Sequence, residues 1–208
     1  MPRAGLSSDA VVRLAVEVVD AGGTSGFADL TLAKVAAKAG VAAPSLYKHV
    51  GSLADLRREV TLIAVGEVTA AATSATVGRA GADALRALAT AWRSYALDHP
   101  GRYAATQIGP DPDAPADAAL RDAAAESVQV VVAVLRGFGL PDARLIDAVR
   151  AVRAGVHGFV TLELGGGFRM REDVGQSFAV LLDMLVAGVA ALAPSDTPPS
   201  DTTTGSHS

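Results

Sequence analysis

The chain contains no cysteine, and only 4% of its 208 residues are aromatic. Without cysteine, neither a disulfide framework nor a thiolate metal site is possible, and a reducing compartment is the default expectation. Few aromatic residues together with abundant alanine favour closely packed helices over a sheet sandwich, which needs many aromatic and β-branched side chains. The composition therefore predicts an all-α protein.

A hydrophobic run long enough to cross a membrane is also missing. The longest late apolar stretch, residues 178–193, is short for a span and contains Asp183. At the N-terminus, Ser7, Ser8 and Asp9 precede any apolar run, which is not the pattern of a signal peptide. We therefore expect a cytoplasmic protein without membrane association.

Lysine is scarce and unevenly placed. The formal net charge is −4, which argues weakly against nucleic acid as a partner. Residues 1–60, however, carry seven basic and six acidic side chains, whereas residues 61–208 carry eleven and sixteen. All three lysines, Lys34, Lys38 and Lys48, lie in the first segment. The charge pattern therefore leaves the N-terminal segment open to an anionic partner.

Residues with catalytic or metal-binding potential do not cluster in the sequence. The histidines are scattered, at positions 49, 99, 157 and 207, without the spacing of a metal site. No serine or carboxylate pair marks a nucleophile or an acid–base site. Residues Gly165 to Gly167 lack the strand, lysine and hydroxyl of a phosphate loop and are interpreted as a turn. We expect neither an enzyme nor a bound cofactor or metal.

Helical spacing and turn signals predict about nine helices. Ser8 is expected to cap the first helix, and Gly22 with Gly23 to end it. Thr31 and Gly40 are expected to bound the second. The remaining helices are predicted at 43–49, from 53 into the 70s, and at 81–98, 100–107, 116–138, 142–164 and 173–192.

The second and third predicted helices are short and joined by a tight turn at Gly40 and Val41. Braced by another helix, such a pair has the geometry of a helix-turn-helix, here spanning residues 31–50, which lays one exposed helix in a DNA major groove. Residues 30–41 read LTLAKVAAKAGV and residues 44–50 read PSLYKHV. This string closely resembles the N-terminal DNA-binding domain of the tetracycline-repressor (TetR) family over about residues 8–60. The resemblance implies a bacterial homodimer whose subunits each place the helix at 43–49 in one half-site of a palindromic operator.

The same helix carries the predicted phosphate contacts. Tyr47 and His49 can donate to phosphate oxygens, as the matching positions do in the family. Lys48 adds a positive charge, and Thr31 with the N-terminus of its helix can bind a further phosphate. The alternative is that Tyr47 and His49 only cover a small helical core, and that Lys34 and Lys38 form a solvated face.

Base contacts are predicted to be sparse. Ala42, Ala43 and Pro44 can only touch thymine methyl groups, and Ser45 can bond to several bases.

Two positions depart from the family pattern. Leu53 stands where a lysine is common, and Ala42 where a serine is common. The departures remove a phosphate contact and a helix cap. The basic residues expected to compensate are Arg3, Arg57 and Arg58.

The chain is predicted to have three parts. Residues 1–52 are predicted to form the DNA-binding domain, residues 53–193 a larger antiparallel helical bundle for effector binding and dimerisation, and residues 194–208 a disordered tail. Residues 1–7 are expected to be a loose arm. The helix that begins at Leu53, with Ser52 and Asp55 as a near capping box, is expected to bridge the two domains.

Residues 156–168, VHGFVTLELGGGF, resemble the tryptophan-histidine-glycine (WHG) type of C-terminal domain in one branch of the family, with Val156 in place of the tryptophan. An effector pocket is expected where the scarce aromatic residues concentrate. The alternative is that these residues are core, with His157 a structural histidine that needs a hydrogen-bond partner. The candidate effector-binding residues are Trp92, Tyr95, Tyr103, Gln107, Phe138 and His157.

The last two predicted helices carry long apolar stripes. Such a pair commonly meets its symmetry mate in a four-helix interface, and the alternative is an ordinary core within one subunit. The candidate interface residues are Val149, Val152, Val156, Val160, Phe178, Leu181, Leu182, Leu185 and Val189.

These observations predict a DNA-binding transcriptional regulator, preferably a repressor that a small-molecule effector releases from its operator. In the mechanism that the resemblance implies, the effector shifts the helix from Leu53 and so the separation of the two recognition helices. The alternative, prompted by Ala42 and Leu53, is a helical small-molecule or protein binder without functional DNA binding.

Overall fold

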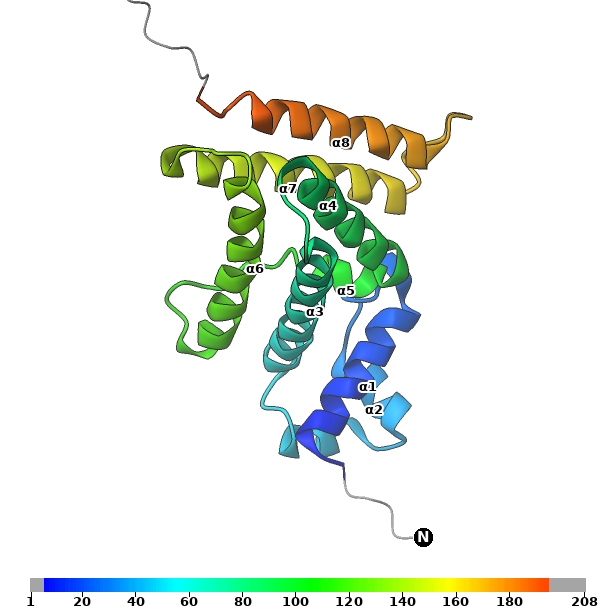
Figure 1. The fold of residues 1–208 in the computed structure, drawn as a ribbon. Helices are drawn as coiled ribbons and strands as arrows, with labels where there is room; N and C mark the ends of the chain where they lie inside the picture. The colour runs from blue at the N-terminus through cyan, green and yellow to red at the C-terminus, as the bar shows by residue number, and fades with distance from the viewer. Residues whose placement is uncertain (1–5, 195–208) are drawn as a thin grey trace, which may run out of the picture.

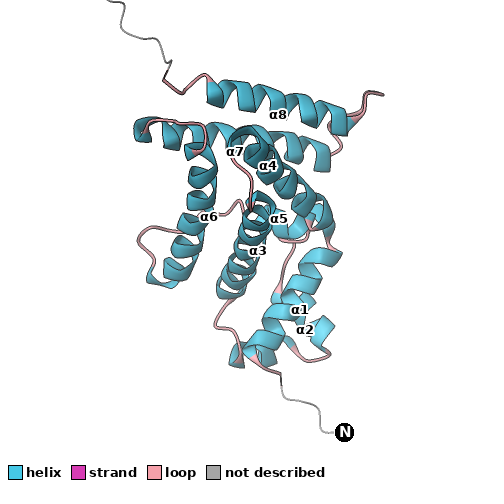
Figure 2. Ribbon diagram, in the orientation of Figure 1, coloured by secondary structure: helices cyan, strands magenta, loops and turns pink. Residues whose placement is uncertain are grey.

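A computed structural model describes residues 6–194, and these residues form helices without any strand (Figures 1 and 2). The all-α prediction is confirmed. The predicted arm with Arg3 and the predicted tail after Pro194 lie outside the described residues, apart from Leu6, Ser7 and Pro194 themselves. The α-helices are α1 (Ser8–Ala21), α2 (Leu32–Ala39), α3 (Leu53–Thr76), α4 (Gly81–Asp98), α5 (Pro100–Ala105), α6 (Ala118–Arg136), α7 (Asp142–Leu164) and α8 (Val174–Ala190), and the 3₁₀ helices are η1 (Gly23–Ser25), η2 (Ala43–Lys48) and η3 (Pro115–Asp117).

The ends of α2 follow the predicted capping chemistry. The hydroxyl of Thr31 accepts a hydrogen bond from the amide of Lys34, and Gly40 ends the helix with φ of 68°. A left-handed conformation of this kind costs glycine little because it has no Cβ. The turn between α2 and η2 is therefore specified by local sequence.

The start of α1 differs from its prediction. Ser7, not Ser8, caps the helix and accepts a hydrogen bond from the amide of Ala10 at 3.2 Å. The Ser8 hydroxyl instead donates to the backbone carbonyl of His49 at 2.9 Å. Two adjacent serines can both serve as caps on sequence grounds, and a contact from distant His49 decides which one does. Ser8 thereby ties α1 to the end of η2.

One core holds the N-terminal helices together, and α3 extends from it into the rest of the molecule. Leu46, Leu56 and Val60 are fully buried in the core that α1, α2, η2 and the first half of α3 share. Further along α3, Val68 and Ala72 belong to two other clusters, formed with α4, α6, α7 and α8. The proposed division at residue 52 therefore precedes a helix whose two halves serve different cores.

The helices are arranged so that the two ends of the molecule differ. In Figure 1, α1 and α2 lie at one end, α7 and α8 lie side by side across the other, and α3 and α6 run between them. Of the described helices, none combines the length and the hydrophobicity that a membrane span requires.

Candidate nucleic-acid interface and candidate ligand pocket

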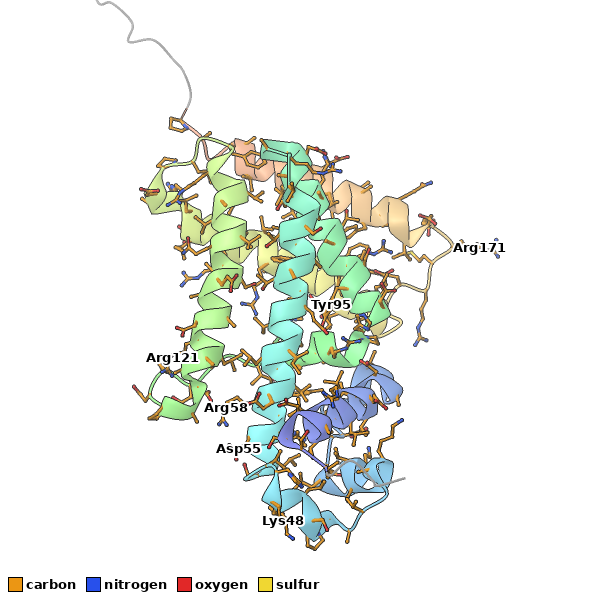
Figure 3. All side chains as sticks on the ribbon, turned by 60° about the horizontal axis from the view of Figure 1, so that its bottom comes forward. Lys48, Asp55, Arg58, Tyr95, Arg121 and Arg171 are labelled. Carbon is orange, nitrogen blue, oxygen red and sulfur yellow. The ribbon has the colours of Figure 1, made fainter. Side chains whose placement is uncertain are left out.

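The tip of the molecule is formed by η2, whose inner side is apolar and whose outer side is polar. Leu46 is fully buried beneath it, whereas Tyr47 is 60% exposed and Lys48 is exposed. Figure 3 shows Lys48 at this tip, with Asp55 and Arg58 following along α3. Within residues 6–194, the side chains of Tyr47 and Lys48 make no hydrogen bond or ion pair, so both are available to a partner.

The other predicted contact residues lie around the same segment. Thr31, Ala42 and Pro44 are exposed, and Ala43, Ser45 and His49 are half-buried. Ala42 occupies the N-cap of η2, where its side chain offers no hydrogen bond, as its departure from the family pattern predicts. The segment predicted as a helix at 43–49 is 3₁₀ rather than α-helical. Short helices commonly take this form.

Three of the other basic side chains of this region, those of Lys38, Arg57 and Arg58, are already engaged. Lys38 pairs with Glu17 at 3.0 Å. Arg57 donates to the backbone carbonyls of Ala28 and Leu30, at 2.8 and 3.2 Å. Its guanidinium holds the loop before α2 instead of facing outward.

Arg58 is engaged as well, because it bonds to the carboxylates of Asp55 and Asp117. Arg57 and Arg58, which were expected to compensate for the missing family residues, therefore both have partners within the subunit. The pKa of Asp117 is lowered, first by a hydrogen bond from the Asp111 amide and then by Arg58. These bonds link the loop before α6 to the start of α3.

A cavity of about 380 Å³ lies among α3, α4, α6, α7 and the segment after α5. Four of the six candidate effector residues line it: Trp92, Tyr103, Gln107 and His157. Its other lining residues are Val65, Val68, Thr106, Ile108, Gly109, Pro110, Leu120, Ala124, Ser127, Val128, Val131, Ile146, Val149, Arg150 and Arg153.

Tyr95 and Phe138 do not reach the cavity. The Tyr95 hydroxyl donates to Glu67 at 2.8 Å, and burial followed by this hydrogen bond raises the pKa of the phenol. Phe138 packs against the core formed by α4, α6 and α7. Both residues therefore contribute to packing within the subunit. Their residue type alone did not distinguish this role from ligand binding.

Tyr103 and His157 face each other across the cavity wall. The phenol oxygen lies 3.2 Å from Nδ1 of His157. Burial raises the pKa of Tyr103 to about 12, and burial followed by the charge of Arg153 lowers the pKa of His157. Both groups are consequently uncharged near neutral pH, and His157 has the hydrogen-bond partner that its partial burial requires.

Helix α5 connects this cavity to the N-terminal core. Arg102 binds Asp20 of α1 at 2.8 Å and Glu67 of α3 at 2.6 Å, and the next residue, Tyr103, lines the cavity. A Cβ at Gly101 would lie 2.7 Å from the carbonyl oxygen of Val19, so α5 rests directly on the end of α1. Sequence reasoning missed this junction because its partners are far apart along the chain.

Seven of the nine candidate interface residues lie inside the subunit. Leu181 and Leu185 are half-buried, and the others are at most 7% exposed. For these seven, the alternative of an intrasubunit core holds, because their helical stripe faces α4 and α6 as well as the neighbouring helix. The buried seven are Val149, Val152, Val156, Val160, Phe178, Leu182 and Val189.

The outward side of α7 and α8 is nevertheless apolar. Leu162, Val180 and Met184 are 54%, 58% and 68% exposed. Ala154 and Gly158 of α7 are exposed between them, and a Cβ at Gly158 would meet nothing within 4 Å. These residues could have been found by their period, which is that of the buried stripe on the opposite side of each helix.

The chain is similar to known proteins over most of its length. Residues 85–185 match the family described as "Tetracyclin repressor-like, C-terminal domain". The chain is 37% identical, over 193 residues, to the "Uncharacterized HTH-type transcriptional regulator Rv0681" of Mycobacterium tuberculosis, covering 91% of this chain and 83% of that protein.

Solved structures have the same fold. Mycobacterium smegmatis BioQ has a TM-score of 0.66 and 24% identity, covering 90% of this chain and 100% of its own. A BioQ structure with its double-stranded DNA operator has a TM-score of 0.64. A TetR variant from Acinetobacter baumannii, in complex with minocycline, has a TM-score of 0.65 and 21% identity, covering 92% of this chain and 100% of its own.

Proposed function

The chain belongs to the TetR family of DNA-binding transcriptional regulators, and from this premise we propose that it is a homodimeric repressor released from a palindromic operator by a small molecule. One observation carries the proposal: the same subunit has an unengaged polar tip at Tyr47 and Lys48 and, at a distance from it, an apolar cavity. BioQ has been solved with operator DNA and the A. baumannii TetR variant with minocycline, which supports both activities for this fold.

The tip binds DNA mainly through phosphate contacts. Tyr47 and His49 donate to phosphate oxygens, Lys48 adds charge, and Thr31 and the free amides at the start of α2 hold another phosphate. The short side chains of Ala42 to Ser45 come close to base edges and read thymine methyl groups. Residues 1–52 act as the DNA-binding domain, and residues 53–193 as the regulatory domain.

The homodimer forms through the outward side of α7 and α8. Val180 and Met184, with the small residues Ala154 and Gly158, leave a surface on which a second copy of the two helices can pack closely. A two-fold axis here would relate two η2 tips, which suits an operator made of two half-sites. A dimer seated on promoter DNA blocks polymerase without a further contact, so we place its action in the bacterial cytoplasm as repression, with no catalytic step.

Release requires that the cavity and the tip communicate. Tyr103 of α5 lines the cavity while Arg102 holds Asp20 of α1. A ligand that moves α5 therefore also moves α1, to which Ser8 ties the end of η2. The ligand favours one arrangement of the tips, and operator DNA favours the other.

Selection of binding sites from random double-stranded DNA with the purified protein tests the function. The expected result is enrichment of a palindrome, followed by binding whose affinity falls steeply with salt because phosphate contacts release counterions. Enrichment of no sequence by protein of native helical content would instead favour a small-molecule or protein binder without functional DNA binding.

A further inference from the structure

The cavity has an unbalanced charge. Two arginines of α7, Arg150 and Arg153, line it, and none of its lining residues is an aspartate or glutamate. Neither arginine forms an ion pair within residues 6–194. Glu163, an acidic residue further along the same helix, accepts hydrogen bonds from Nη2 and Nε of Arg93, at 2.6 and 2.8 Å. The positive charge at the cavity is therefore not neutralised by the chain itself.

The two arginines lie together at one side of the cavity. Positions 146, 149, 150, 153 and 157 share one face of α7, because each lies three or four residues from another of the set. Arg150 and Arg153 are exposed, whereas Val149 beside them is buried. The guanidinium groups therefore lie at the rim, and the apolar wall continues inward through Val68, Leu120 and Val131.

Neighbouring polar groups carry no opposing charge. Burial raises the pKa of Tyr103 to about 12, and burial together with Arg153 lowers the pKa of His157, so both are neutral hydrogen-bonding groups near pH 7. A cationic ligand would meet two like charges at the rim, and a neutral one would leave them unused. An anion gains charge-assisted hydrogen bonds from planar guanidinium groups.

On the basis of the proposed regulatory function, we propose that the ligand is an amphiphile: an apolar body inside the cavity with one anionic headgroup held by Arg150 and Arg153 at its rim. The volume of about 380 Å³ lies in the range of small-ligand sites. Carboxylate and phosphate headgroups share this chemistry, and matched probes separate them.

Four probes with ten-carbon chains test the headgroup: decanoate, whose tenth carbon is the carboxylate, decyl phosphate, decanol and decyltrimethylammonium, each kept below its micelle concentration. Trp92 is the only tryptophan of the chain and lines the cavity, so its fluorescence reports binding directly. We expect one or both anions to bind at least about tenfold more tightly than decanol, and the cation most weakly. Equal affinities for all probes, no binding of either anion, or a preference for the cation would overturn the proposal.

Charge reversal gives the sharper test. The variant Arg150→Glu with Arg153→Glu should lose the preference for anions and gain one for decyltrimethylammonium, while Arg144→Gln, an exposed site on α7 outside the cavity, should change neither. An unchanged preference in the reversed variant would contradict the assignment. DNA affinity is measured separately, without probe. If the protein binds decanoate but no DNA, only the proposed repressor function is refuted. If it binds a palindrome but no anion, only the ligand class is refuted.

Discussion

Leu46 is fully enclosed in the N-terminal core while its neighbour Tyr47 is 60% exposed, whereas the C-terminal helices leave a cavity of about 380 Å³ between them. In the N-terminal region, the candidate functional side chains are exposed on the surface of a well-packed core. In the C-terminal region, the candidate functional feature is a cavity between the helices. A motif can specify the first kind of site because its residues are neighbours in sequence, but the second depends on how five segments pack together.

The largest expected effect compares leucines in the two regions. Leu46→Ala should lower the free energy of unfolding by about 2–5 kcal/mol, because it leaves a new void in a filled core. Leu120→Ala should cost less, since Leu120 already borders the cavity and loses neighbours on one side only. Urea unfolding followed by circular dichroism measures both. Equal losses would show that the C-terminal core is packed as tightly as the N-terminal one.

The next effect concerns the exposed side of η2. Tyr47→Ala and His49→Ala should each weaken operator binding by about 1.5–3 kcal/mol, the worth of a hydrogen bond to a charged group, while the dimer is retained. Fluorescence anisotropy with labelled operator measures the affinity, and light scattering the oligomeric state. Val77→Ala, at a 75% exposed site directly after the end of α3, serves as the control. Unchanged affinity would remove the two residues from the DNA interface and favour a role in covering the core.

A third experiment tests whether the two regions communicate through α5. Asp20→Asn should leave the separate affinities for operator and decanoate nearly unchanged, but reduce by about 1 kcal/mol the amount by which decanoate weakens operator binding. The reason is that Arg102 loses its charged partner on α1 and keeps Glu67. Asp83→Asn breaks the exposed pair with Arg79 and is the matched control. The same coupling in wild type and Asp20→Asn would exclude this junction.

A smaller gain is expected at the start of η2. Ala42→Ser should stabilise the domain by about 0.5–1 kcal/mol, because the N-cap has extended geometry, with φ of −73° and ψ of 140°, but no side-chain hydrogen bond. Thermal unfolding measures the change, and operator affinity should rise modestly as the segment becomes better ordered. Ala33→Ser, on the exposed side of α2, provides a serine without a cap. A lower melting temperature for Ala42→Ser would mean that the new hydroxyl does not cap η2.

The smallest effect is a pH dependence in the regulatory domain. Burial, and then Arg153, lowers the pKa of His157 below its ordinary value of about 6.5, so the unfolded chain binds this proton more readily than the folded chain. The contribution of His157 to the free energy of unfolding should therefore be constant above about pH 6.5 and should decrease as the pH falls below this value. His157→Gln should have a shallower decrease in urea unfolding between pH 7 and 5. Parallel curves for the two proteins would assign the pH dependence to other groups.

Prediction from sequence succeeded where the determinants are local. Thr31, Gly40 and Ser52 bound helices as expected, because caps and turns depend on a few neighbouring residues. The predicted helices at 81–98 and 142–164 match α4 and α7. Ser7 and Ser8 were confused because the deciding contact is with His49, 41 positions away.

Site residues in the regulatory domain were harder to identify for the same reason. Periodicity finds that a helix has an apolar stripe but not whether a neighbour of the same subunit or of another one covers it. Tyr95 and Tyr103 look equivalent in sequence, yet the Tyr95 hydroxyl donates to Glu67, whereas Tyr103 lines the cavity. The contribution of Arg150 and Arg153 was missed because an exposed arginine on a helix is ordinary until the space beside it is known.

The contact between Gly101 and the end of α1 also has a genetic consequence. A side chain there would collide with the backbone carbonyls of Val19 and Gly23 and push α5 away from α1, although position 101 itself neither lines the cavity nor belongs to the DNA-binding tip. Mutations that lock a regulator in one state are usually sought among ligand contacts. In this protein, a screen for strains that no longer respond to the small molecule should also return substitutions at position 101, in proteins whose pocket-lining and recognition-helix residues are all unchanged.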